Sequence, residues 1–190
     1  MAIRIAVLTI SDLGFQGKRV DTSGKAIADW AAAQGFEVSS RDIVPDESDR
    51  IASVLSRWAD DGAADVIITT GGTGLSPRDV TPEATRMVIE RDVPGIAEAI
   101  RAAGQARTPR SALSRGLAGA RAQTLIVNLP GSPSRVKEGL KVLEPIVEHA
   151  VQLLTGRPTD HTGGQGGTAG RRDGGSGKQE PAKGKRRAPK

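Results

Sequence analysis

The chain has 190 residues, of which 37% are apolar and 26% charged, and it contains two Trp, two Phe, no Tyr and no Cys. This length fits one domain with a core of Val, Ile, Leu and Ala, and the lack of cysteine excludes disulfides, thiolate metal sites and a Cys nucleophile. Residues 161–190 hold eight of the 27 Lys and Arg but only two of the 22 Asp and Glu. They therefore carry a net charge of +6, whereas the other 160 residues carry a net charge of −1. A basic surface spread over the whole fold is therefore excluded.

The first 70 residues alternate apolar segments with amphipathic ones. Residues 3–10 are a largely apolar run, rich in β-branched residues and typical of a strand that is buried on both faces. Thr22 or Ser23 can cap the helix that follows, and Gly35 can end it. The predicted strands cover residues 3–10, 36–44 and 65–70, and the predicted helices between them cover residues 22–35 and 48–60.

The next part of the chain continues this alternation. Thr81 is predicted as an N-cap, followed by Pro82 in the first helical position and Glu83 in the first turn. No element is predicted for the basic residues 107–121, whose apolar residues show no clear period. The remaining predicted elements are a helix from residue 81, a helix over residues 96–105, a strand over residues 124–129 and one long helix over residues 136–154, which Gly156 ends.

The composition changes at the C-terminal end. Residues 161–190 contain nine of the 24 glycines and, as apolar residues, only three alanines. They bury too little apolar surface to offset the entropy of ordering, so we expect an ordered domain over residues 1–156 and a disordered, Gly-rich basic tail over residues 157–190. A solvating tail is favoured over a polyanion contact, and no nucleic-acid partner is expected, because no aromatic residues for base stacking lie between the basic ones.

The N-terminus and the apolar segments indicate where the protein acts. No basic leader with a cleavage site precedes the first apolar run, and no window approaches the roughly 20 apolar residues that span a bilayer. We therefore expect a cytoplasmic protein without a membrane partner.

The order of the predicted elements indicates the fold. Apolar strands that alternate with amphipathic helices predict right-handed βαβ crossovers, and hence an α/β fold: a three-layer sandwich with an open, mainly parallel sheet. Ligands of such sheets bind beyond the carboxyl ends of the strands. The loops expected at that edge cover residues 11–22, 44–48, 71–81 and 130–134.

The loop Gly71-Gly72-Thr73-Gly74 follows a predicted strand and precedes a predicted helix. Its backbone can approach a ligand closely and can present successive N–H groups to a phosphate, which a nearby helix N-terminus also favours. The loop lacks the Lys-Ser/Thr ending of a Walker loop and the third glycine of a dinucleotide fingerprint. Taken alone, it is explained equally well as a turn that requires positive φ.

Acidic residues lie in the neighbouring loops. Asp46 and Asp79 are expected at the same sheet edge as the glycines, and paired carboxylates beside phosphates indicate a divalent cation. Helix capping is the simpler role for either residue alone. Asp12 and Asp21 are open to the same two interpretations, and Ser132 has the simple alternative role of capping the last helix.

Together, these loops resemble a known family. The matching motifs are Ser11-Asp12, Asp21-Thr22-Ser23-Gly24, Thr69-Thr70-Gly71-Gly72-Thr73-Gly74, Arg78-Asp79-Val80-Thr81-Pro82-Glu83-Ala84 and Leu129-Pro130-Gly131-Ser132-Pro133. In this order and with these separations they resemble the MoaB/Mog family of molybdenum-cofactor biosynthesis, over residues 3 to about 156. The resemblance implies a molybdopterin-binding fold, a homotrimer in most members and a hexamer in some, and a molybdenum-insertion protein as a partner.

The resemblance also implies a reaction and its residues. In catalytic members, the terminal phosphate of molybdopterin attacks the α-phosphorus of Mg-ATP, which gives adenylylated molybdopterin and pyrophosphate. Asp46 and Asp79 match the catalytic aspartates and are expected to position Mg²⁺, directly or through water. The residues expected to bind molybdopterin and ATP are Ser11, Asp12, Gly71, Gly72, Thr73, Gly74, Thr81, Pro130, Gly131 and Ser132. Which loop contacts the pterin and which the nucleotide stays open.

Two functions are consistent with these features. A molybdopterin adenylyltransferase is favoured, because both aspartates and the glycine loop are present. The alternative is a molybdopterin-binding or carrier protein without activity, since a fold alone does not establish chemistry. Release of pyrophosphate from a mixture of the protein, molybdopterin and Mg-ATP distinguishes the two.

Overall fold

A computed structural model describes residues 2–156, and the predicted tail over residues 157–190 lies outside the described residues. The elements are, in chain order, β1 (Arg4–Ile10), α1 (Asp12–Phe15), α2 (Thr22–Ala33), β2 (Glu37–Val44), α3 (Ser48–Asp60), β3 (Val66–Thr70), α4 (Thr81–Val88), β4 (Arg91–Asp92), α5 (Pro94–Gln105), the 3₁₀ helix η1 (Pro109–Leu113), β5 (Ala118–Arg121), β6 (Thr124–Leu129), α6 (Pro133–Leu143) and α7 (Val147–Thr155). No helix among these residues is both long and apolar enough to cross a membrane.

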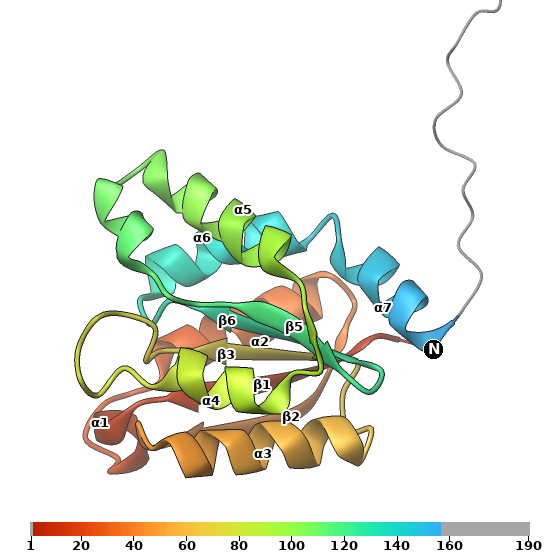
Figure 1. The fold of residues 1–190 in the computed structure, drawn as a ribbon, viewed down its shortest axis with the longest axis horizontal. Helices are drawn as coiled ribbons and strands as arrows, with labels where there is room; N and C mark the ends of the chain where they lie inside the picture. Colours follow the sequence, from red (N-terminus) through yellow and green to blue (C-terminus); the bar gives the residue numbers. More distant parts are fainter. Residues whose placement is uncertain (1, 157–190) are drawn as a thin grey trace, which may run out of the picture. The chain divides into compact units, whose positions relative to one another are not determined.

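The strands form one open sheet with helices on both of its faces (Figure 1). Their order is β2-β1-β3-β6-β5-β4. The pairs β1–β2, β1–β3 and β3–β6 are parallel, whereas β5 pairs antiparallel with both β6 and β4. The predicted α/β fold with a mainly parallel sheet is therefore confirmed.

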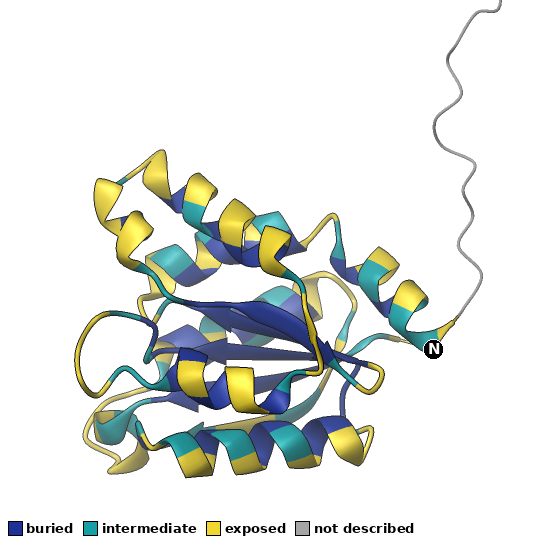
Figure 2. Ribbon diagram, viewed as in Figure 1, coloured by how far each residue is buried: buried dark blue, intermediate teal, exposed yellow. Residues whose placement is uncertain are grey.

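The central strands of the sheet are buried (Figure 2), and side chains that alternate along them belong to two core clusters. Ile5 and Val7 of β1 belong to a cluster with residues of α2, α5, α6 and α7. Ala6 and Leu8 belong to a second cluster with residues of α3 and α4. A strand buried on both faces is apolar along most of its length, which is why residues 3–10 predict β1.

The long helix predicted over residues 136–154 is wrong, because the structure has two helices there, α6 and α7. Pro145 lies between them. A proline removes one helical N–H donor, and its ring clashes with the carbonyl four residues earlier. Val147 and Val151 of α7 still pack in the same cluster as α6. The apolar period therefore continues across the break and conceals it.

Two helix starts also differ from the prediction. Asp21, rather than Thr22 or Ser23, caps α2, and its Oδ1 accepts a hydrogen bond from the N–H of Gly24 at 2.7 Å. Helix α4 begins at Thr81, and the N-cap is Val80 without a side-chain cap. The Thr81 hydroxyl is therefore free for another contact.

Residues 107–121 contain η1 and β5, neither of which the sequence pattern predicts. The sequence of β5 is Ala-Gly-Ala-Arg, without a β-branched or aromatic residue. Its pairing with β6 and β4 places it in the sheet, which overrides the weak intrinsic preference. A Cβ at Gly119 would lie 2.8 Å from the carbonyl oxygen of Arg91, so the close pairing with β4 requires glycine.

Candidate active site

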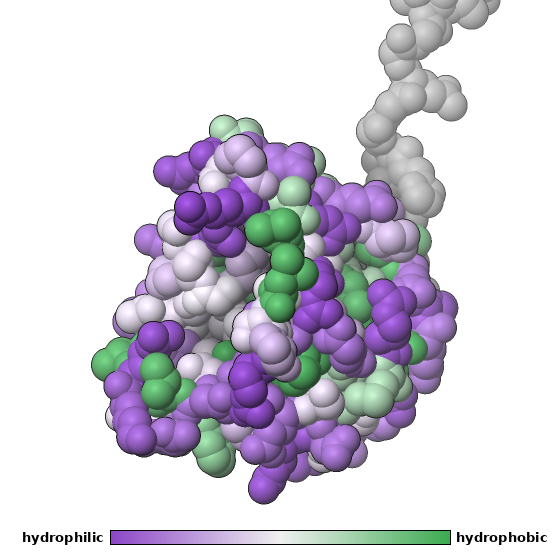
Figure 3. Space-filling view, turned by 60° about the vertical axis from the view of Figure 1, so that its left-hand side comes forward, coloured by the Kyte–Doolittle hydropathy of each residue, from purple (hydrophilic) through white to green (hydrophobic). Residues whose placement is uncertain are grey.

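The carboxyl ends of β1, β2, β3 and β6 lie at one edge of the sheet, beside α1 and the loop before α4 (Figure 1). Two adjoining cavities, of about 570 and 660 Å³, open at this edge. The first lies against the loop before α2, and the second lies between the glycine loop and the start of α6. Figure 3 shows this side of the molecule, where pale, weakly polar surface lies between strongly hydrophilic side chains.

The structure brings most of the predicted site residues to these cavities. Ser11, Asp46 and Gly71 line the first cavity, Thr73, Gly74, Asp79 and Pro130 line the second, Gly72, Gly131 and Ser132 line both, and Asp12 and Thr81 line neither. Because the two cavities share three residues, two ligands bound in them would meet at these residues.

Asp12 and Asp46 join the loops that follow β1 and β2. The N–H of Asp12 donates to Oδ2 of Asp46 at 3.0 Å, and the N–H of Asp46 donates to Oδ1 of Asp12 at 3.1 Å. Arg78 donates to both carboxylate oxygens of Asp12 at 2.8–3.1 Å. This contact ties the loop before α4 to the other two and lowers the pKa of Asp12.

Asp46 is more buried than Asp12, and it lines the first cavity. Burial raises its pKa, and the neighbouring charges of Asp12 and Asp79 act in the same direction. Its Oδ1 accepts no hydrogen bond from the described residues. One carboxylate oxygen therefore remains for a ligand, in surroundings where a bound cation would offset the cost of its negative charge.

Helix capping does not account for Asp46, Asp79 or Ser132. The N-caps of α3 and α4 are Glu47 and Val80, and neither has a side-chain cap. Ser132 is the N-cap of α6, but its side chain accepts no capping bond. The side chain of Asp79 instead accepts a hydrogen bond from the N–H of Ser76 at 2.8 Å, in the segment between the glycine loop and α4. None of these three side chains therefore caps a helix.

The two glycines at the start of the loop have positive φ, 102° at Gly71 and 62° at Gly72. A Cβ at Gly71 would lie 2.2 Å from the carbonyl oxygen of Ile10, and one at Gly72 would lie 2.3 Å from Oγ1 of Thr81 and 3.1 Å from Oδ1 of Asp46. Both the backbone conformation and the close packing therefore require glycine.

The loop also carries a row of free donors. The N–H of Gly71 donates to Leu129 at 3.3 Å and that of Ser76 donates to Asp79, whereas the N–H groups of residues 72–75 make no hydrogen bond with any described residue. Successive N–H groups of this kind form anion sites. The first turn of α6 borders the same cavity and adds the positive end of a helix dipole.

Thr81, expected to bind a ligand, is completely buried and lies beneath the loop. Its hydroxyl donates to the carbonyl of Gly71 at 3.0 Å, and the Thr85 hydroxyl donates to the carbonyl of Thr81 at 2.8 Å. Nδ2 of Asn128 donates to the hydroxyls of Thr69 and Thr85, both at 3.0 Å. This buried polar chain supports the loop from below. Thr81 lines neither cavity, and its contact with a ligand stays a prediction.

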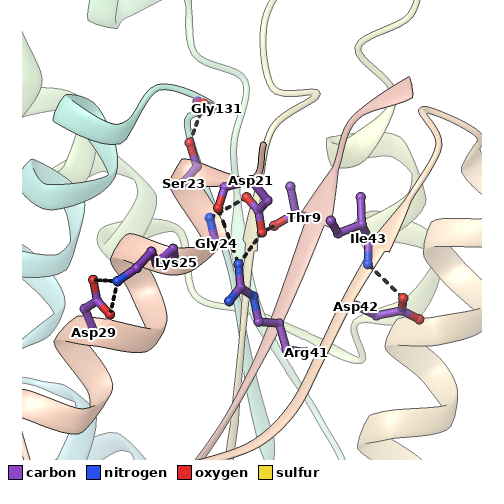
Figure 4. Close-up of polar contacts among 10 residues, drawn as sticks. All are labelled: Thr9, Asp21, Ser23, Gly24, Lys25, Asp29, Arg41, Asp42, Ile43 and Gly131. Carbon is purple, nitrogen blue, oxygen red and sulfur yellow. Dashed lines mark hydrogen bonds and ion pairs between the residues drawn. The ribbon is translucent and has the colours of Figure 1, made fainter. Parts of the chain in front are cut away.

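The start of α2 is tied to the loop after β6 (Figure 4). Oδ2 of Asp21 accepts hydrogen bonds from Thr9 at 3.0 Å and from Arg41 at 2.8 Å. The Ser23 hydroxyl donates to the carbonyl of Gly131 at 2.7 Å. Asp21 is thus a structural cap, and it helps to fix one wall of the first cavity.

The acidic residues at the two cavities are spread over several loops and do not form a metal centre by themselves. No group of three or more His, Cys, Asp or Glu side chains among residues 2–156 could hold a metal ion. Mg²⁺ is usually held by one or two carboxylates together with water and substrate phosphates. Asp46 and Asp79 fit that donor set.

Several arginines at this edge were not predicted from the sequence. Arg19 lines the first cavity, and Arg110 and Arg135 line the second. The side chains of these three residues make no ion pair with a described residue, so they are available to an anionic ligand. The basic character of residues 107–121 was the only signal for Arg110, because those residues show no helical or strand period.

Comparison with known proteins agrees with this arrangement. Residues 6–149 match the family described as "Probable molybdopterin binding domain". The chain is 38% identical over 156 residues to the molybdopterin adenylyltransferase of Helicobacter pylori, a match that covers 81% of this chain and 89% of that protein. It is 43% identical over 154 residues to the molybdenum cofactor synthesis protein cinnamon of Drosophila melanogaster, which covers 80% of this chain but about a quarter, 26%, of that longer protein.

A solved structure shows the same relationship. The molybdopterin biosynthesis enzyme MoaB of Thermus thermophilus has a TM-score of 0.77 and 51% sequence identity, with 82% of this chain and 98% of that chain covered. The family match over residues 6–149 spans the loops that line both cavities. The chain therefore belongs to the molybdopterin-binding MoaB/Mog family of molybdenum-cofactor biosynthesis.

Proposed function

We propose that the chain is a molybdopterin adenylyltransferase, which transfers AMP from Mg-ATP to the terminal phosphate of molybdopterin and releases pyrophosphate. The observation that carries this proposal is the placement of Asp46 and Asp79 in two adjoining cavities at the glycine loop, where neither carboxylate caps a helix. The name and the 38% identity of the Helicobacter pylori relative support it.

The reaction needs alignment and charge neutralisation rather than a covalent intermediate with the protein. A phosphate oxygen of molybdopterin attacks the α-phosphorus, and the bond from the α-phosphorus to the oxygen that bridges to the β-phosphate breaks. That oxygen leaves with pyrophosphate. The attacking and leaving groups lie on opposite sides of the α-phosphorus, which suits two substrates in adjoining cavities that share Gly72, Gly131 and Ser132.

The residues around the second cavity supply positive charge for a chain of phosphates. The N–H groups of residues 72–75 and of the first turn of α6 are donors in fixed positions, and Arg110 and Arg135 add full charges. Asp46 and Asp79 would hold Mg²⁺ directly or through water, and the ion would neutralise charge on the leaving pyrophosphate.

The family resemblance supports a proposal about the assembly and location of the protein. We propose a cytoplasmic homotrimer that passes its product to a molybdenum-insertion protein. The match to a segment of the longer cofactor synthesis protein cinnamon supports a partner that acts in the same pathway.

The test measures pyrophosphate released from purified protein, molybdopterin and Mg-ATP, with a control that lacks molybdopterin. Asp46→Asn and Asp79→Asn should each lower the rate at least about 100-fold, the scale of one preorganised electrostatic contact. Asp61→Asn is the matched control, because Asp61 is exposed at the end of α3. Wild-type rates in both site variants would contradict the assignment. Molybdopterin binding without pyrophosphate release would favour the carrier function.

A further inference from the structure

Arg115 contacts the glycine loop without lining either cavity. It lies between η1 and β5, in the segment for which no element was predicted. Its backbone N–H donates to the carbonyl of Thr73 at 2.9 Å, Nε donates to the carbonyl of Gly74 at 2.6 Å, and Nη2 donates to the carbonyl of Asp79. Nη1 pairs with Glu83 in the first turn of α4. Arg115 therefore contacts both the glycine loop and the end of the segment that leads from it to α4.

These contacts fix the direction of three peptide groups. The described residues contain no cis peptide bond, and in a trans peptide the C=O and the following N–H point in opposite directions. Because the carbonyls of Thr73, Gly74 and Asp79 point toward Arg115, the N–H groups of the residues that follow them point away from it. None of these three N–H groups donates to a described residue.

The direction of these groups matters for an anionic ligand. A carbonyl oxygen that faced a phosphate would repel it, whereas an N–H in the same place would bind it. Thr73, Gly74 and Asp79 line the second cavity, and Arg115 does not. Arg115 therefore contacts these carbonyl oxygens from outside the space that the ligand would occupy.

We infer that Arg115 is a positioning residue for phosphate binding: it holds the carbonyls of the glycine loop and of Asp79 away from the second cavity, so that the N–H groups of Gly74 and Leu75 and the Asp79 carboxylate are available to the substrate. This inference rests on the proposed function. A guanidinium suits the role because its planar fork directs several donors in fixed directions, whereas a lysine offers a single ammonium group.

Arg121 provides a matched control at the other end of α4. It donates to both carboxylate oxygens of Asp60 at 2.7–2.8 Å and to the carbonyl of Val88 at 3.0 Å. Its side chain is 25% exposed, compared with 34% for Arg115. Arg121 thus also joins α4 to a neighbouring segment, but it contacts no residue of the glycine loop.

The experiment compares the wild type with Arg115→Gln, Arg115→Lys and Arg121→Gln. Binding of pyrophosphate in the presence of Mg²⁺ is measured by calorimetry, and adenylyl transfer is measured at saturating substrates. Arg115→Gln should lower kcat about 100-fold and weaken pyrophosphate binding at least about 10-fold, the scale of misplaced electrostatic contacts. Arg115→Lys should recover part of both losses, and Arg121→Gln should keep wild-type kcat and affinity.

Wild-type kcat and affinity in folded Arg115→Gln would overturn the inference. Equal losses in Arg115→Gln and Arg121→Gln would also overturn it, because they would mark a general structural role. If Arg115→Gln does not fold, Arg115→Lys decides: reduced kcat and affinity support the inference, and wild-type values overturn it. If the wild type transfers no AMP but Arg115→Gln still weakens pyrophosphate binding, the proposed function fails and the positioning role stands.

Discussion

Gly72→Ala should destabilise the protein through two separate effects. Gly72 has a φ of +62°, and a residue with a Cβ pays about 1–2 kcal/mol in that region. The new Cβ would also lie 2.3 Å from the Thr81 hydroxyl, which is completely buried and donates to Gly71. Displacing that group costs about 1–3 kcal/mol, as overpacking or a lost buried hydrogen bond does. We expect the free energy of unfolding to fall by about 2–5 kcal/mol.

Gly35→Ala separates these two effects. Gly35 has a similar φ of +74°, but no atom lies within 4 Å of the position that its Cβ would take. This variant should therefore lose only the backbone part, about 1–2 kcal/mol. The difference between the two variants measures the packing of the glycine loop against Thr81.

Urea denaturation of both variants gives the two free energies, and titration of the folded proteins gives their affinity for molybdopterin. Gly72→Ala should also weaken this affinity, because its Cβ lies 3.1 Å from Oδ1 of Asp46 and displaces a wall of both cavities. Equal destabilisation of the two variants, together with wild-type affinity in Gly72→Ala, would refute the reasoning. The loop would then be a turn without a role in ligand binding.

Two further predictions concern pH and the tail. Arg78 lowers the pKa of Asp12 in the folded protein, so this pair stabilises the fold above the unfolded pKa of about 4 and the stabilisation is lost as the pH falls through the folded pKa. Arg78→Gln should therefore show a smaller drop in melting temperature between about pH 5 and pH 3 than the wild type, and an unchanged drop would contradict this linkage. Truncation after Asp160 should leave the mass of the proposed trimer in light scattering and the turnover at high salt unchanged, and loss of either would show that the tail is structural or catalytic.

The sequence predicts the fold where side-chain patterns decide it. The strands β1, β3 and β6 are buried on both faces, and two thirds of their residues are apolar. Strand β5 lacks such a pattern, because pairing with its neighbours and not its side chains places it in the sheet. The break before α7 is missed for the opposite reason, since the apolar period continues across Pro145.

The same distinction applies to the site. Parallel strands bring their following loops together, so the positions of Asp46 and Asp79 at one edge can be predicted. Whether these carboxylates cap helices depends on local geometry that the sequence leaves open. Thr81 lies in a matching motif yet points into the core, and Arg115 reaches a residue 36 positions earlier in the chain. Contacts between residues so far apart in the sequence leave no local pattern from which they could be predicted.

The central claim is that AMP passes from ATP to molybdopterin at the edge formed by the two cavities. The most direct measurement follows radioactive phosphorus from ATP labelled at the α- or the γ-phosphate, with purified protein, molybdopterin and Mg²⁺. The α-label should appear in the molybdopterin product and the γ-label in pyrophosphate, and both transfers should fall together in Asp46→Asn and Asp79→Asn. Bound molybdopterin with all of the label left in ATP, or γ-label on molybdopterin, would contradict it.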